Sequence, residues 1–164
     1  MSMNNYIDEN FESLYKMNIE QITFSIFEMV KRVEKGNIIF KKELPISFKW
    51  KDENKTLLIE SIVLNIPILP IYLCETVDFR YDVMDGYNRI KTIYQFINNE
   101  IPLINSQIFG TKIYFRQLES SIQRKIEDYP LMMCILKYSN NPNIKREFFK
   151  RINSQKEIME DNND

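Results

Sequence analysis

The segment with the clearest chemical potential is a predicted strand that runs through an Asp-Gly turn directly into a predicted helix. It reads Tyr81-Asp82-Val83-Met84-Asp85-Gly86-Tyr87-Asn88-Arg89-Ile90-Lys91-Thr92. Backbone N–H groups at the start of a helix lack intrahelical partners and carry partial positive charge, so they form an anion site. Gly86 lets the backbone approach a phosphate closely or adopt a positive φ angle. Arg89, in the first helical turn, can add a two-pronged contact to the same anion.

Asp85 can play several roles at this turn. It can cap the helix, hold a metal ion or orient a water molecule. The segment also has a purely structural interpretation, because Asp-Gly is a common turn and Asp a common N-cap. Arg89 counts slightly against that interpretation, since a cation near a helix N-terminus is unfavourable unless an anion lies nearby. We expect Arg89 to be exposed, so that its removal would leave the stability of the ligand-free protein nearly unchanged.

The chain resembles the GmrSD-type N-terminal domain family, a ParB/sulfiredoxin-like family, over about residues 18–153. That family shows a Trp, then a "LIeSil-giPiPpiyl" run, then a "viDGqQRLtTi" motif and a later "iF-rlN" motif. The matching stretches here are Trp50, Leu57–Ile62 with Ile66–Leu73, Val83–Ile93 and Phe148–Asn153.

The resemblance implies a nucleotide-binding domain, with NTP hydrolysis as an option, from a system that recognises modified or foreign DNA. The implied nucleotide site consists of Asp85, Gly86, Tyr87, Asn88 and Arg89. Asp85 and Arg89 are its catalytic candidates. A triphosphate usually travels with Mg²⁺, which one or two carboxylates hold. Asp85 is the candidate Mg²⁺ ligand, and Asp82 is a weaker one because it can simply face solvent from its strand.

The sequence departs from the family pattern in two places. The family's Gln-Arg before the Trp is replaced by residues 45–49, Pro-Ile-Ser-Phe-Lys, and its central Gln-Gln by Tyr87-Asn88. The family chain often continues into an HNH nuclease domain, whereas this sequence contains no histidine. HNH chemistry, Ser-His-Asp catalysis and His-ligated zinc are therefore excluded for the printed chain.

Two functions from different classes follow. The first is an NTP-binding domain that acts with DNA. If it is an enzyme, it is an NTPase or one part of a split nuclease system that has a separate nuclease subunit. The alternative is a non-catalytic remnant, or a DNA-binding or interaction module, that keeps the fold. Whether the chain is an enzyme stays open at this point.

Several further residues have both a functional and a structural interpretation. Trp50 can stack on a base, but a lone Trp after a loop more often anchors that loop on the core, which we favour. Glu60 can reach the site or lie on a solvated helix face. Thr92 is interpreted as structural, and Asn153 is a candidate site residue on the basis of the family motif alone. The last helix carries basic side chains, which we interpret as a solvated face rather than a DNA contact: Lys145, Arg146, Lys150 and Arg151.

Composition and charge set further limits. The 164 residues, 44% of them hydrophobic, suffice for one domain with a real core. The net charge of −1 provides no global positive field, so any nucleic-acid contact must be local. The absence of alanine, with Ile, Asn and Lys abundant, indicates an AT-rich genome. No apolar run approaches the ~18–20 residues of a membrane span and no signal peptide is recognisable, so we expect a soluble, cytoplasmic protein.

The elements that must position these residues form an α+β pattern, a small mixed sheet surrounded by helices. Helices are predicted over 18–35, 53–65, 87–98, 118–128 and 143–153. Strands are predicted over 38–40, 71–75, 80–84 and 131–138, with a loop or irregular strand over 41–51 and a hairpin over 107–115. The first helix rests on an Asn18-Gln21 capping pattern and on isoleucines and valines at helical spacing.

The predicted organisation is a loose lead-in (1–17), one ParB-like domain (18–153) and an acidic, disordered tail (154–164). Cys74 and Cys134 each lie in an apolar predicted strand. We therefore expect both thiols to be buried, reduced and not bridged to each other.

Overall fold

The computed structural model describes residues 17–40 and 50–161, with side chains described through residue 154. The predicted loop residues 41–49 and nearly all of the predicted lead-in lie outside this described part. The elements in chain order are β1 (Ile19–Ser25), α2 (Ile26–Glu34), β2 (Ile38–Ile39), α3 (Asp52–Val63), β3 (Ile71–Glu75), β4 (Tyr81–Asp85), α4 (Tyr87–Ile97), β5 (Leu103–Ser106), β6 (Gly110–Ile113), the 3₁₀ turn η1 (Phe115–Gln117), α5 (Ser120–Glu127), β7 (Pro130–Leu136) and α6 (Pro142–Asp161).

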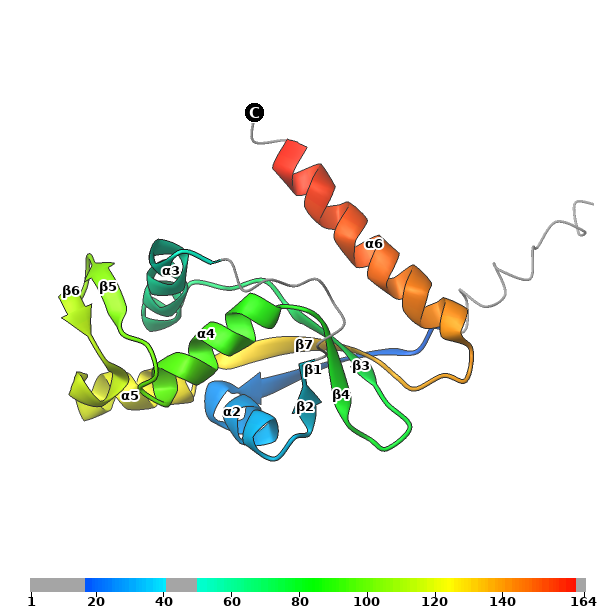
Figure 1. Ribbon diagram of the computed structural model, residues 1–164, viewed down its shortest axis with the longest axis horizontal. Coiled ribbons are helices and arrows are strands. Elements are labelled where there is room, and N and C mark those ends of the chain that lie inside the picture. Colours follow the sequence, from blue (N-terminus) through cyan, green and yellow to red (C-terminus); the bar gives the residue numbers. More distant parts are fainter. Residues whose placement is uncertain (1–16, 41–49, 162–164) are drawn as a thin grey trace, which may run out of the picture.

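The main sheet has five strands in the order β1-β7-β3-β4-β2 (Figure 1). Strand β1 runs antiparallel to β7, and β3 is parallel to β7 but antiparallel to β4. The short strand β2 adds to β4 in parallel. The hairpin β5–β6 forms a separate sheet of two strands. This arrangement confirms the predicted α+β class with a small mixed sheet among helices.

The sheet contributes side chains to two separate hydrophobic clusters, one on each face. Alternate residues of a strand point to opposite faces, so β3 directs Ile71 and Leu73 one way and Cys74 the other. The larger cluster packs the first face against α2, α3, α4 and α5. The smaller cluster joins the second face to α6 through Cys74, Met84, Leu136, Ile144, Phe148 and Ile152. In Figure 1, α6 rises away from the rest of the fold beyond this contact.

The predicted first helix over 18–35 is wrong in its first half. Residues Ile19–Ser25 form strand β1, which pairs with β7 along its whole length. The helix begins only at Ile26, where the Ser25 hydroxyl accepts a hydrogen bond of 3.1 Å from the Glu28 backbone N–H. The true N-cap signal is therefore Ser25-x-x-Glu28.

Two other boundaries differ from expectation. The hairpin occupies 103–113 rather than 107–115, because its first strand starts at Leu103. Helix α6 continues beyond residue 153 to Asp161, so its last turns fall within the stretch predicted as a disordered tail. The division of the chain into lead-in, domain and tail otherwise stays a prediction.

Both cysteines are buried and are not bridged to each other, as predicted. Burial raises the pKa of the Cys134 thiol, which disfavours the reactive thiolate. Within the described residues, no helix combines the length and the apolar character needed to cross a membrane.

Candidate phosphate-binding pocket

The predicted strand–turn–helix is present where strand β4 meets helix α4. Gly86 is the N-cap of α4 and has a φ angle of +93°, which side-chain-bearing residues rarely adopt. A Cβ atom at this position would lie 2.9 Å from Ile71 Cγ1, which is too close for a real contact. The turn therefore requires glycine for both its backbone angle and its packing. The N-cap residue Gly86 makes no side-chain hydrogen bond to α4, so it does not occupy the first N–H groups of the helix.

Asp85 and Arg89 lie together and form an ion pair one helical turn apart. The Arg89 Nη2 atom donates to Asp85 Oδ2 at 3.0 Å and to the backbone oxygen of Pro70, also at 3.0 Å. The two side chains are only 12% and 15% exposed, so the prediction of an exposed Arg89 is wrong. Asp85 thus orients the guanidinium instead of capping the helix. The Asp85 carboxylate also offsets the unfavourable interaction between the Arg89 cation and the positive N-terminus of α4.

Two buried polar atoms at this ion pair have no hydrogen-bond partner among the described residues. They are the Nε–H of Arg89, a donor, and the Oδ1 atom of Asn88, an acceptor. Buried polar atoms are nearly always paired, so such atoms call for an explanation. A bound group that offers both an acceptor and a donor would satisfy them.

These residues line a hollow of about 280 Å³ that is shared by three parts of the chain. Trp50 precedes α3, Met84 and Asp85 end β4, Gly86 to Arg89 begin α4, and Phe149 with Asn153 come from α6. All five residues of the predicted nucleotide site, Asp85, Gly86, Tyr87, Asn88 and Arg89, are thus brought together with the Trp and the Asn of the other two motifs.

Trp50 is half-buried and packs against the main core, in keeping with the structural interpretation, while the loop that it is expected to anchor lies outside the described residues. Its presence in the pocket lining also leaves it available for stacking. Phe149 is a pocket residue that the sequence motifs alone do not identify as a site residue. The signal for it is its spacing, because residues four apart lie on the same face of a helix and Asn153 is four residues further along.

Two acidic residues have roles that the sequence did not predict. The Asp82 side chain is 3% exposed and pairs with Lys145 Nζ at 2.7 Å, so Asp82 does not face solvent. Glu60 is also buried, and its Oε1 atom accepts hydrogen bonds from the Ser106 hydroxyl at 2.7 Å and the Gln107 N–H at 2.8 Å. Glu60 therefore ties α3 to the β5–β6 hairpin and neither reaches the pocket nor lies on a solvated face.

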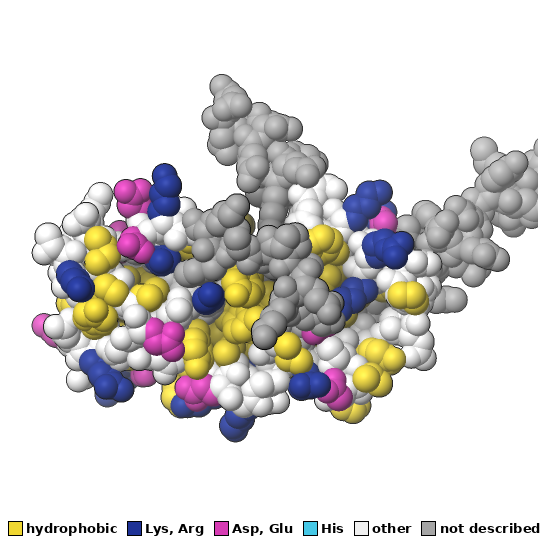
Figure 2. All heavy atoms as spheres, viewed as in Figure 1, with side chains coloured by type: hydrophobic (Ala, Val, Ile, Leu, Met, Phe, Trp, Pro, Cys, Tyr) yellow, Lys and Arg dark blue, Asp and Glu magenta, His cyan; other side chains and the backbone are white. Residues whose placement is uncertain are grey.

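The remaining candidates behave largely as predicted. Thr92 is fully buried within α4, in keeping with a structural role. On α6, Arg146 and Lys150 are exposed and Arg151 pairs with Glu147 at 2.8 Å, whereas Lys145 is committed to Asp82. Figure 2 shows basic and acidic side chains intermixed over the visible face, without a single broad basic field.

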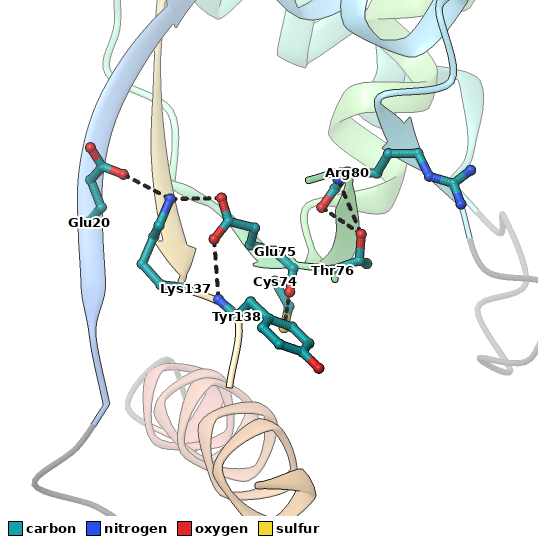
Figure 3. Close-up of polar contacts among 7 residues, drawn as sticks. All are labelled: Glu20, Cys74, Glu75, Thr76, Arg80, Lys137 and Tyr138. Carbon is teal, nitrogen blue, oxygen red and sulfur yellow. Dashed lines mark hydrogen bonds and ion pairs between the residues drawn. The ribbon is translucent and has the colours of Figure 1, made fainter. Parts of the chain in front are cut away.

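A second polar cluster joins the ends of three neighbouring strands (Figure 3). Lys137 Nζ lies 2.7 Å from Glu75 Oε1 and 3.5 Å from Glu20 Oε2, and the Tyr138 N–H donates to Glu75 Oε2 at 3.2 Å. The hydrogen bond from Lys137 lowers the pKa of Glu75, and the same bond raises the pKa of Lys137. The cluster connects β1, β3 and the end of β7, away from the pocket at α4.

The family model described as the GmrSD restriction endonuclease N-terminal domain matches residues 47–162. The match covers most of the chain, and the protein belongs to this family. It includes every described residue of the pocket lining, from Trp50 to Asn153, but not β1, α2 or β2. No curated protein matched the chain.

Proposed function

We propose that the pocket at the start of α4 binds a nucleotide through its phosphates, as the nucleotide-binding part of a restriction or defence system. The observation that carries this proposal is the meeting of three segments, distant in sequence, around one hollow that contains a helix N-terminus and a buried arginine. Membership of the GmrSD N-terminal domain family supports the restriction-system context.

The chemistry of the lining suits a nucleotide. The first N–H groups of α4 and the Nε–H of Arg89 are donors for phosphate oxygens. The Asn88 Oδ1 atom can accept a hydrogen bond from a ribose hydroxyl or a base amino group. Trp50 and Phe149 supply aromatic side chains on which a base can stack.

Asp85 is the single carboxylate among the described residues of this lining. It would be the protein ligand of Mg²⁺, which would neutralise phosphate charge and which binds proteins through one or two carboxylates together with substrate phosphates. Its ion pair with Arg89 keeps the carboxylate beside the proposed phosphate position. The proposal concerns binding, and hydrolysis stays an expectation from the family resemblance.

We also propose that a separate nuclease subunit acts on DNA beside this chain. A nuclease centre of the HNH type needs histidine, which these 164 residues lack, so cleaving residues of that type would lie outside them, and a separate subunit is the source that we propose.

Isothermal titration calorimetry with GTP, ATP and CTP, each with and without Mg²⁺, tests the binding proposal. The key variant is Arg89→Lys, which keeps a cation for Asp85 but loses the planar fork. We expect affinity to fall about tenfold or more in this variant, because a hydrogen bond to a charged group contributes roughly 1.5–3 kcal/mol. The matched control is Arg124→Lys on the exposed surface of α5, which should bind like wild type. Absence of heat with all three nucleotides, or equal affinity in Arg89→Lys, would contradict the proposal.

A further inference from the structure

Strand β1 is an edge strand, and its outer backbone groups have no hydrogen-bond partner among the residues that the structure describes. Its one neighbour among the described strands is β7. The Asn18 oxygen accepts a hydrogen bond from the Lys137 N–H at 2.9 Å, and the Ile26 N–H donates to the Tyr129 oxygen at 3.1 Å. Backbone groups alternate in direction along a strand, so the even-numbered residues between them also bond to β7. The N–H and C=O groups of Ile19, Gln21 and Thr23 therefore point outward.

Nothing in β1 protects this edge in the ways that proteins usually employ. The strand contains no proline and no glycine, its register with β7 is continuous, and Glu20 is its one charged residue. Large apolar side chains nearby are half exposed, with Ile19 at 44%, Phe27 at 52% and Met132 at 49%. An unguarded edge beside apolar surface favours pairing with another strand.

We propose that β1 pairs antiparallel with β1 of a second copy of this chain, about a two-fold axis through Ile22. In this register Gln21 lies opposite Thr23 of the second copy, and each such pair exchanges both of its backbone hydrogen bonds. A closed two-fold dimer results, and the two main sheets become one continuous sheet.

The side chains are complementary in this register. Ile22 is half-buried, packs against the main core and would meet Ile22 of the second copy, which completes its burial. Glu20 would lie opposite Phe24 of the second copy. The Arg32 guanidinium lies 4.3 Å from the centroid of the Phe24 ring and 2.9 Å from Glu28, so each Glu20 carboxylate would lie near an Arg32 that already pairs with Glu28 of its own chain. A register centred on Gln21 would not bring Glu20 opposite Phe24.

Sedimentation velocity over a range of protein concentrations tests the dimer. Gln21→Pro removes an outward N–H that makes no bond to any described residue, so the variant should fold but sediment as a monomer. The control is Ser120→Pro, at the exposed first position of α5, where proline is well tolerated. It should sediment like wild type. Circular dichroism confirms the fold of both variants. A monomeric wild type at all concentrations, or a dimer that survives Gln21→Pro, would overturn the proposal.

A cysteine scan tests the register independently of any proline effect. Ile22→Cys should form a disulfide-linked dimer under mild oxidation, because directly opposite positions of a non-hydrogen-bonded pair lie within about 4.5–5.5 Å. The native Cys74 and Cys134 are buried and give a low background. Gln21→Cys is the matched control and should remain largely uncross-linked. Cross-linking through Gln21→Cys instead of Ile22→Cys would contradict the two-fold axis at Ile22.

Discussion

Arg89 contributes to the fold as well as to the proposed ligand site. Its guanidinium is 12% exposed, pairs with Asp85 and also bonds the backbone oxygen of Pro70, which leads into β3. The residue thus joins the start of α4 to the chain segment that precedes the central strand. A functional test that deletes this side chain would measure stability and binding together, which is why the lysine variant is the better probe.

The first prediction concerns the stability of this pair. Arg89→Ala should lower the free energy of unfolding by about 3 kcal/mol, because it removes an ion-pair partner of a largely buried carboxylate together with the hydrogen bond to the Pro70 oxygen. Urea denaturation followed by circular dichroism measures the change. The control Arg124→Ala, on an exposed part of α5, should stay within about 0.5 kcal/mol of wild type. A similar loss of unfolding free energy in both variants would show that the ion pair between Asp85 and Arg89 does not stabilise the fold more than an exposed arginine does.

The second prediction concerns acid stability and Glu75. Its pKa is lowered in the folded protein, chiefly by the hydrogen bond from Lys137. A lowered folded pKa means that the stabilisation is present above the unfolded pKa of Glu75 and is lost as pH falls through the folded one. The raised pKa of Lys137 adds no loss in this acidic range, because its own contribution disappears only at strongly alkaline pH.

Urea midpoints of wild type and Glu75→Gln, measured from pH 7 down to pH 3, test this. Wild type should be more stable at pH 7, and the two curves should converge as the pH falls. Glu34→Gln, on the exposed C-terminal turn of α2, serves as a control for generic charge effects. If the difference in urea midpoint between wild type and Glu75→Gln stays constant with pH, the ionisation of Glu75 is not the source of the stabilisation.

At the scale of elements, the sequence predicts local units better than distant pairings. The β4–α4 unit is predicted almost to the residue because its signals, an apolar strand, Asp-Gly and helical spacing, are contiguous. The spacing of Ile19, Ile22 and Ile26 fits a helix, but β1 is decided by pairing with β7, more than 100 residues away. The same reason hides the roles of Glu60 and Asp82, whose partners Ser106 and Lys145 are distant in sequence.

Helix α6 is held by a small cluster and a buried ion pair, and it also forms one wall of the pocket. Phe148 and Ile152 pack on the second face of the sheet, while Lys145 pairs with the buried Asp82. Phe149 and Asn153 lie on the pocket side of the same helix. The position of α6 therefore determines whether Phe149 and Asn153 meet Trp50 and the start of α4.

The third prediction follows from this docking. Lys145→Ala should increase the hydrogen exchange of amides in α6 without a comparable change in α3 or α4, because the helix loses its polar attachment but keeps its own backbone bonds. Exchange measured by mass spectrometry on peptides covering residues 142–153 reports this directly. Lys150→Ala changes an exposed lysine on the same helix and should leave exchange unchanged. Equal exchange in wild type and Lys145→Ala would contradict the proposed attachment.

For the whole molecule, the family match and the structure divide the chain differently. The match starts at residue 47, yet β1, α2 and β2 belong to the same sheet and core as the matched part. The described lining of the pocket lies within the matched segment, whereas the proposed dimer edge lies outside it. Ligand binding and self-association can therefore be tested with separate variants on one protein.

The central claim is that the pocket at α4 binds a nucleotide, and the fluorescence of Trp50 tests it most directly. Trp50 is the one Trp of the chain and lines the pocket, so its emission reports on this site alone. Titration of wild type with GTP, ATP or CTP should give a saturable change for at least one nucleotide, reversed by excess inorganic triphosphate because both ligands need the same phosphate donors. In Arg89→Lys the same titration should require about tenfold more nucleotide or greater. An unchanged Trp50 signal with every nucleotide at millimolar concentration would contradict the account.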